Sequence, residues 1–320
     1  MSATATEASL PRAAAAGADP APAAARPGPL LTWTNLWIVY IVWGSTYLAI
    51  RVMVETIPPL LGAGVRFVVA GAGVLAFLAA RRGWAAIRPT RAELAGCLLV
   101  GTLLMGANAV VTIAEVGVPS AMAALLIASM PLFVIVLRRA TGDPITRASM
   151  AGVVVGFAGV AILLLPGERP DGASLLGMLA IVGAAVMWAS GSFLSPRRRL
   201  PRDPFVSTGW QMLLGGVVCA LAGVANGEIP DVHPAAFSAD SVIAFAYLVT
   251  FGSLVAFSAY VWLLQNVRVS KVATYAYVNP VIAIALGWLI LGETITATTL
   301  TGAAIIVASV ATVVRAESRS

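Results

Sequence analysis

The sequence has little charge, a single histidine and only two cysteines. Of its 320 residues 11% are charged and 59% hydrophobic, with a mean hydropathy of +0.92, whereas soluble domains have about 25% charged residues. His233 has no companion ligand nearby, and Cys97 and Cys219 both lie in apolar runs, so we expect no metal, cofactor or disulfide framework. The net charge of +6 comes from short arginine clusters between apolar runs, which argues against a nucleic-acid partner.

Long apolar runs take up most of the chain. A helix needs about 20 mainly apolar residues to cross the hydrocarbon core of a bilayer. The sequence therefore predicts an all-α integral membrane protein, with a lipid bilayer as a partner and ten transmembrane helices. The expected spans are 34–54, 59–80, 94–114, 119–138, 148–166, 174–195, 205–226, 240–264, 270–291 and 296–315.

The beginning of the chain differs from the rest. It is rich in Ala and Pro and has no basic start followed by an early apolar stretch, so we expect a disordered cytoplasmic tail over 1–33 and not a cleaved signal. The remaining parts are predicted as a first repeat (34–167), a second repeat (174–315) and a short C-terminal tail (316–320).

The basic residues are distributed unevenly over the predicted loops. With the N-terminus inside, 17 of the 20 basic residues fall on the cytoplasmic side, and only Arg51, Arg66 and Arg169 do not. This asymmetry follows the positive-inside rule, so both termini are expected in the cytoplasm. Nineteen of the 20 are arginines, which with the Ala/Gly content indicates a GC-rich bacterial genome and hence a bacterial inner membrane.

The two halves of the chain resemble each other. At an offset of 150, Ser120 pairs with Ser270 and Asp143 with Glu293, and an offset of 145 pairs Trp43 with Trp188. Each half has five predicted spans, an odd number, so the second copy must be inverted relative to the first. Inverted repeats are the architecture of many secondary transporters, because two near-equivalent packings expose one site alternately to either side.

Two segments also resemble a known family. The runs WGSTYLAIRVMVETIPPLLGAGVRF (Trp43 to Phe67) and ATYAYVNPVIAIALGWLILGE (Ala273 to Glu293) are similar to the EamA family of the drug/metabolite transporter superfamily, most closely to its bacterial ten-span exporters. The resemblance covers about Asn35 to Val314. It implies a five-plus-five helix fold, cytoplasmic ends, a central cavity shared by the halves, and substrates among amino acids, other metabolites and drug-like compounds. The first predicted span has no acid until Glu55, unlike the related four-span multidrug pumps.

Arg66 is a charged residue about seven positions into the second predicted span. Arginine in a membrane helix normally faces a cavity or a partner. It could hold the carboxylate of a substrate, form an ion pair with Glu115, or extend its charge to the membrane surface. At an offset of 145 its counterpart is Gln211, also polar and within a span, which favours a position in the substrate pathway for both.

Glu115 lies near the end of the third predicted span. It could bind a proton or cation during transport, or lie at the membrane interface without a coupling role.

Further polar, aromatic and proline residues lie near the middle of the spans. Pro131 and Pro280 each remove a backbone donor, so a kink at either could act as a hinge. The residues expected to line a substrate pathway, with interhelical hydrogen bonding as the alternative for each, are Trp43, Asn108, Trp188, Ser258, Tyr275 and Asn279.

Together these features predict a secondary transporter, an exporter of small metabolites, amino acids or drug-like amphipathic compounds working by alternating access. No GxxxxGK[ST] phosphate-binding loop occurs. One alternative is an intramembrane enzyme acting on lipid-linked substrates, but the spans contain no His and no pair of acids for such chemistry. The other is a structural membrane protein that transports nothing.

Overall fold

The computed structural model describes residues 28–165 and 173–317, and every regular element in these ranges is helical. The helices of the first half are α1 (Pro29–Met53), α2 (Pro59–Arg82), α3 (Trp84–Ile87), α4 (Arg91–Ala114), α5 (Ser120–Ile127), α6 (Met130–Ala140) and α7 (Arg147–Leu164). Those of the second half are α8 (Leu175–Leu194), η2 (Ser195–Arg197), α9 (Pro204–Ala225), η3 (Ile229–Asp231), η4 (Pro234–Ala236), α10 (Ala239–Tyr247), η5 (Leu248–Val255), α11 (Ala256–Asn266), α12 (Val269–Val272), α13 (Tyr275–Leu291) and α14 (Ala297–Glu317).

The predicted all-helical membrane fold is confirmed. In the described ranges nine helical segments are long and apolar enough to cross a membrane, and α13 is a shorter apolar helix at the position of the ninth predicted span. Helix α1 begins at Pro29 and so takes in five residues of the predicted tail, because proline is well suited to a first helical position and apolar residues follow it. The rest of that tail, the segment 166–172 with Arg169, and residues 318–320 lie outside the described residues.

Local sequence signals set the helix ends. The hydroxyl of Thr90 accepts a bond from the backbone N–H of Glu93, whose carboxylate accepts from Thr90 in return, so α4 begins with a capping box. Pro59 and Pro204 occupy the first positions of α2 and α9. Gly292, with a φ of 65°, ends α13 in a left-handed conformation.

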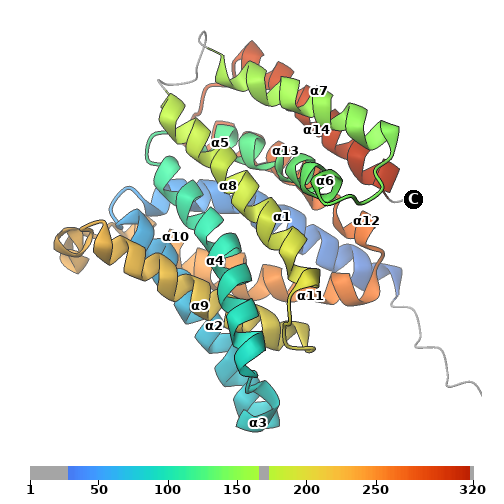
Figure 1. Cartoon of the computed structure of the whole chain (residues 1–320). Helices are drawn as coiled ribbons and strands as arrows, with labels where there is room; N and C mark the ends of the chain where they lie inside the picture. The colour runs from blue at the N-terminus through green and yellow to red at the C-terminus, as the bar shows by residue number, and fades with distance from the viewer. Residues whose placement is uncertain (1–27, 166–172, 318–320) are drawn as a thin grey trace, which may run out of the picture.

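The helices of the two halves pack in equivalent pairs. Helix α2 packs against α9, and α7 lies beside α14 at the edge of the molecule (Figure 1). The contact of α4 with α8 is matched by that of α1 with α10 and α11, and the contact of α6 with α8 by that of α1 with α13. Exchanging the halves therefore turns the first two pairs into themselves and each of the others into its equivalent, as an inverted repeat requires.

Small residues bring α2 and α9 into backbone contact. A Cβ atom added to Gly64 would lie 2.7 Å from the Cα of Ala220, and one added to Gly216 would lie 2.7 Å from the backbone nitrogen of Val68. Close approach of this kind increases dispersion contact, which stabilises helix pairs in lipid where the hydrophobic effect does not.

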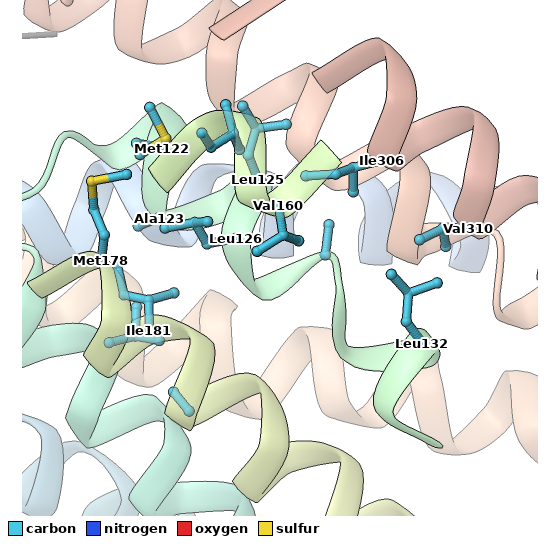
Figure 2. Packing of buried hydrophobic residues seen from close by; sticks show 14 of the residues in the cluster. Met122, Ala123, Leu125, Leu126, Leu132, Val160, Met178, Ile181, Ile306 and Val310 are labelled. Carbon is cyan, nitrogen blue, oxygen red and sulfur yellow. The ribbon is translucent and has the colours of Figure 1, made fainter. Parts of the chain in front are cut away.

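A large apolar cluster joins helices of both halves. Figure 2 shows side chains of α5, α6, α7, α8 and α14 packed against one another. Its labelled members are buried, among them Leu125, Leu126, Val160, Met178, Ile181, Ile306 and Val310. The cluster unites the halves, since α5 and α7 come from the first and α8 and α14 from the second.

Two membrane segments are not continuous α-helices, and a third contains a proline within its helix. The fourth is split, because α5 ends at Ile127 and α6 starts at Met130 with Pro131 in its first turn, so the kink expected at this proline is a break. Pro280 lies inside α13, as expected. The eighth segment, predicted as one plain span, contains the π-helical stretch η5, a conformation that is frequent at functional sites.

Candidate substrate cavity

A cavity lies in the middle of the helix bundle. Its walls come from α1, α2, α4, α5 and α6 of the first half and from α8, α11 and α13 of the second. The aromatic and polar side chains that line it are Trp43, Thr46, Tyr47, Arg66, Asn108, Trp188, Phe257, Tyr275 and Asn279. An apolar, aromatic-rich cavity with a few polar groups is typical of small-molecule sites.

Most of the residues expected in a substrate pathway meet in this cavity. The six that line it are Trp43, Arg66, Asn108, Trp188, Tyr275 and Asn279. Both expected hinge residues, Pro131 and Pro280, also line it. The break in the fourth segment and the proline inside α13 therefore face the cavity.

Two expected pathway residues lie elsewhere. Gln211 is buried between helices, where its Nε2 donates to the hydroxyl of Ser207 at 2.8 Å and its backbone packs on Gly101. Ser258 is exposed on α11 and lines a separate small pocket with Ser253. An offset between repeats does not specify how each helix is rotated, so their counterparts Arg66 and Asn108 face the cavity and they do not.

Aromatic rings form one wall of the cavity. The ring of Trp43 lies 5.1 Å from that of Phe257 and 5.2 Å from that of Tyr275, both in edge-to-face geometry. The Trp43 Nε1 donates to the backbone oxygen of Gly252 at 3.2 Å, which holds the indole against η5. Rings fixed in this way present an ordered apolar surface to a solute.

Arg66 is the charged group of the cavity wall. Its side chain is 3% exposed, its Nε donates to the hydroxyl of Ser253 at 3.0 Å, and its Cζ lies 4.7 Å from the ring centroid of Phe67. Within the described residues no carboxylate lies within 4.0 Å of the guanidinium, and its two Nη groups make no hydrogen bond to protein. The ion pair with Glu115 is thus not formed, and the low exposure also contradicts extension of the charge to the surface.

The sequence reasoning missed the part of η5 that holds Arg66. Ser253 is fully buried and accepts the hydrogen bond from the Nε of Arg66. The next residue back, Gly252, leaves room for the guanidinium, because a Cβ atom added to it would lie 3.2 Å from an Arg66 Nη. Thr46 and Tyr47, one turn along α1 from Trp43, also line the cavity unpredicted. The only sequence signal was the Gly252–Ser253 pair in the middle of an apolar run.

Asn279 connects α13 to α1 beside the proline. With its amide oriented to donate, Nδ2 lies 3.2 Å from the backbone oxygens of both Tyr275 and Tyr40. Asn279 therefore combines a place in the cavity wall with interhelical hydrogen bonding, the two readings that the sequence left open.

Glu115 lies just beyond the cavity, at the end of α4. It is fully buried and not at an exposed interface, and Arg51 Nη1 donates to its backbone oxygen and to that of Val116, the latter at 2.8 Å. Among the residues that the structure describes, no group of three or more His, Cys, Asp or Glu side chains could hold a metal ion.

Sequence comparison agrees with this architecture. The model of the EamA-like transporter family matches residues 32–165 and 175–315. The chain belongs to the EamA-like transporter family. It is therefore a membrane transporter, and the resemblance noted from its sequence is confirmed. The two EamA matches fall on the two halves of the fold, and both halves contribute residues to the cavity.

Similar proteins include other transporters of this type. The inner membrane transporter YedA of Escherichia coli (strain K12) is 39% identical over 262 residues, covering 81% of this chain and 83% of that protein. A protein named "Probable amino-acid metabolite efflux pump" from Salmonella typhimurium is 24% identical, covering 85% and 90%. One crystal structure matches with a TM-score of 0.61 at 22% identity, covering 90% of this chain and 98% of that one, which supports the fold alone.

Proposed function

We propose that the protein is a secondary active transporter that exports small amphipathic metabolites bearing a carboxylate, amino acids among them, across a bacterial inner membrane. The observation that carries the proposal is Arg66, a buried guanidinium with no carboxylate partner among the described residues, in a cavity walled by aromatic rings. Relatives named as an inner membrane transporter and as an amino-acid metabolite efflux pump support this assignment.

The chemistry of the cavity favours an anionic solute with an apolar part. A guanidinium can hold both oxygens of a carboxylate at once, and such charge-assisted bonds are strong where water is excluded. Among the residues that the structure describes only the Nε of Arg66 is hydrogen-bonded, to Ser253, which leaves the Nη groups available for this role. Trp43, Trp188 and Tyr275 offer ring surface to the apolar part of the solute.

The shared cavity supports alternating access as the mechanism. Helices of both halves line it, the fourth segment is broken beside Pro131, and Pro280 lies within α13 at the cavity wall. Movement of one half against the other about these two prolines would open the cavity to one side and then the other. We place both termini in the cytoplasm, on the strength of the arginine distribution.

The alternative functions find less support. An intramembrane enzyme would need acid–base or metal-binding groups at its cavity, and the cavity lining includes no Asp, Glu, His or Cys among the described residues. A purely structural role would not explain why the chain keeps the charge of Arg66 buried in a membrane segment, where a charged side chain costs free energy.

Counterflow in liposomes tests the proposal. Liposomes that contain the protein are loaded with an unlabelled amino acid. A panel of labelled amino acids, and of their carboxamides that lack the carboxylate charge, is then added outside. We expect accumulation of at least one carboxylate and of none of the carboxamides. Equal transport of the carboxamides would disprove recognition by Arg66, and no transport of any compound would disprove this substrate class.

Variants of Arg66 make the test specific. Arg66→Gln should abolish counterflow, and Arg66→Lys should lower it about tenfold, because lysine keeps the charge but not the two-point geometry. Ser258→Ala is the matched control, a polar residue of a membrane segment that does not line the cavity, and it should transport at the parent rate. A parent rate in folded Arg66→Gln would contradict the role of the guanidinium.

A further inference from the structure

Three glutamates are buried at the end of the molecule where α4 ends, and one of them differs from the others. The carboxylate of Glu228 accepts from the backbone N–H groups of Leu60 and Leu61, at 3.1 and 2.8 Å. That of Glu293 accepts from the first two N–H groups of α5, at 2.7 and 3.0 Å. Glu115 is 0% exposed, and neither of its carboxyl oxygens has a hydrogen-bond partner among the described residues.

Glu115 separates the central cavity from a second, polar pocket. Asn108 and Val111 line the cavity, and Glu115 follows them on the same face of α4 at helical spacing. The second pocket begins at the next residue, Val116, and is also lined by Arg51, Glu55 and Glu293. A carboxyl group at this position can exchange a proton with the second pocket. Its charge also acts on Arg66 in the wall of the central cavity.

The charged and titratable groups that face Glu115 come from several elements. Tyr47 and Arg51 of α1, Arg66 of α2 and Glu293 after α13 all lie within electrostatic range of its carboxyl. The guanidinium of Arg51 is engaged by backbone oxygens. Helices α8 and α9, which also pack on α4, contain no Asp, Glu, His, Lys or Arg and have Cys219 as their titratable side chain.

We propose that Glu115 is the proton-binding site of the transport cycle and that its protonation is coupled to anion binding at Arg66. An ionised carboxylate buried without a partner is costly, so Glu115 takes a proton from a hydronium ion of the aqueous phase at the second pocket. The O–H bond formed on the carboxyl group replaces the one broken in hydronium, and release of the proton to water reverses this exchange. A negative charge on Glu115 opposes a second negative charge beside Arg66. Proton and anion therefore bind together, and each raises the affinity for the other by the same factor.

The role of Glu115 in transport rests on the proposed function. The test of its protonation does not, because it needs no transported compound. Proton and carboxylate would cross in the same direction as a pair, so the positive charge of the proton cancels the charge of the anion. Net export then requires an outward gradient of the carboxylate that exceeds the opposing inward gradient of protons.

Infrared spectroscopy of the whole protein in lipid vesicles tests the protonation. A protonated carboxyl group has a carbonyl band that shifts when hydrogen is exchanged for deuterium. At neutral pH we expect such a band in the parent protein and in Glu55→Gln, an exposed glutamate of the second pocket, and its loss in Glu115→Gln. A band that persists in Glu115→Gln would overturn the proposal. Should that variant not fold, Glu115→Asp moves the frequency of the band and answers the same question.

A second variant separates coupling from burial alone. Arg66→Gln removes a positive charge that favours the ionised carboxylate, so the pH midpoint at which the band disappears should rise by about one unit. An unchanged midpoint would show that the two groups are not coupled. Because these measurements need no substrate, they hold even if no compound is transported in counterflow.

Transport then completes the test. For the carboxylate identified by counterflow, the parent should move protons with it, detected by a pH-sensitive dye inside the vesicles. Glu115→Gln should keep counterflow and lose the response to an imposed pH gradient. Retention of that response would exclude Glu115 as the coupling site while leaving the transporter assignment intact.

Discussion

Arg66 is held in place by a hydroxyl and an aromatic ring, not by a counter-charge. Ser253 accepts from Nε, and the ring of Phe67 lies beneath Cζ at 4.7 Å. Inserting arginine at the centre of a membrane helix costs about 2.5–3.5 kcal/mol, and a neutral hydroxyl offsets only part of that. We therefore expect Arg66 to bind an anion more readily than it would if it were already paired with a carboxylate.

The hydroxyl of Ser253 should matter for substrate affinity. Ser253→Ala removes the acceptor that orients the guanidinium, at a cost of about 1.5 kcal/mol for a hydrogen bond to a charged group. We expect the KM of counterflow to rise about tenfold with little change in maximal rate. Ser253→Thr, which keeps the hydroxyl, is the control, and an equal loss in both variants would point to packing in η5 instead.

The two glutamates that cap helices should contribute to stability. Glu228 and Glu293 each accept two backbone N–H bonds at helix starts, so replacing either with Gln weakens charged hydrogen bonds by about 1–3 kcal/mol. Thermal unfolding in detergent should show a lower midpoint for Glu228→Gln and Glu293→Gln. Glu55→Gln, exposed at the same end, should unfold as the parent does.

At the scale of elements, the contact of α2 with α9 is the most sensitive to side-chain volume. A methyl group added at Gly64 would lie 2.5–2.8 Å from atoms of Ala220, whereas one added at Gly73 meets nothing within 4 Å. Gly64→Ala should destabilise the protein by about 1–3 kcal/mol through overpacking. Gly73→Ala, the same change in the same helix, should be neutral or slightly stabilising. Equal midpoints of thermal unfolding would contradict close backbone packing of this pair.

Membrane helices could be predicted because their length and apolar composition are set by the bilayer. The ends of most predicted spans lie within a few residues of the helix bounds. The π-helical stretch η5 and the break between α5 and α6 could not be located in the same way. Apolar composition is identical for α- and π-helical turns, and contacts such as that of Trp43 Nε1 with Gly252 come from distant parts of the chain.

At the scale of the whole molecule, the sequence repeat helped to predict most of the cavity-lining residues but not all of them. Arg66 and Asn108 face the cavity, while their offset partners Gln211 and Ser258 do not. The offset partners therefore lie in different surroundings, and sequence spacing alone does not specify which way a side chain faces. The burial of Glu115 was equally hidden, because it depends on α1 and on the turn that carries Glu293.

The two ends of the molecule differ in how their polar contacts respond to salt. At one end Arg82 pairs with Asp203 and Arg197 with Asp143, all partly exposed. Raising ionic strength from about 0.01 M to about 1 M shortens the screening length from about 30 Å to about 3 Å and should weaken these pairs. Hydrogen–deuterium exchange should then accelerate at residues 205–208 of α9 and stay constant at 120–123 of α5. Uniform acceleration at both ends would contradict this difference.

The contact of Arg51 with the backbone of Glu115 and Val116 bears on the speed of the transport cycle. A solute leaving past that contact must wait until a half-buried guanidinium releases two carbonyl groups, whereas at the opposite end of the molecule only the partly exposed pairs of Arg82 with Asp203 and of Arg197 with Asp143 need to separate. The two openings should therefore have unequal opening rates. Turnover would then be limited by the slower of them, and occupancy of the cavity would be set mainly by the concentration of solute at the faster one.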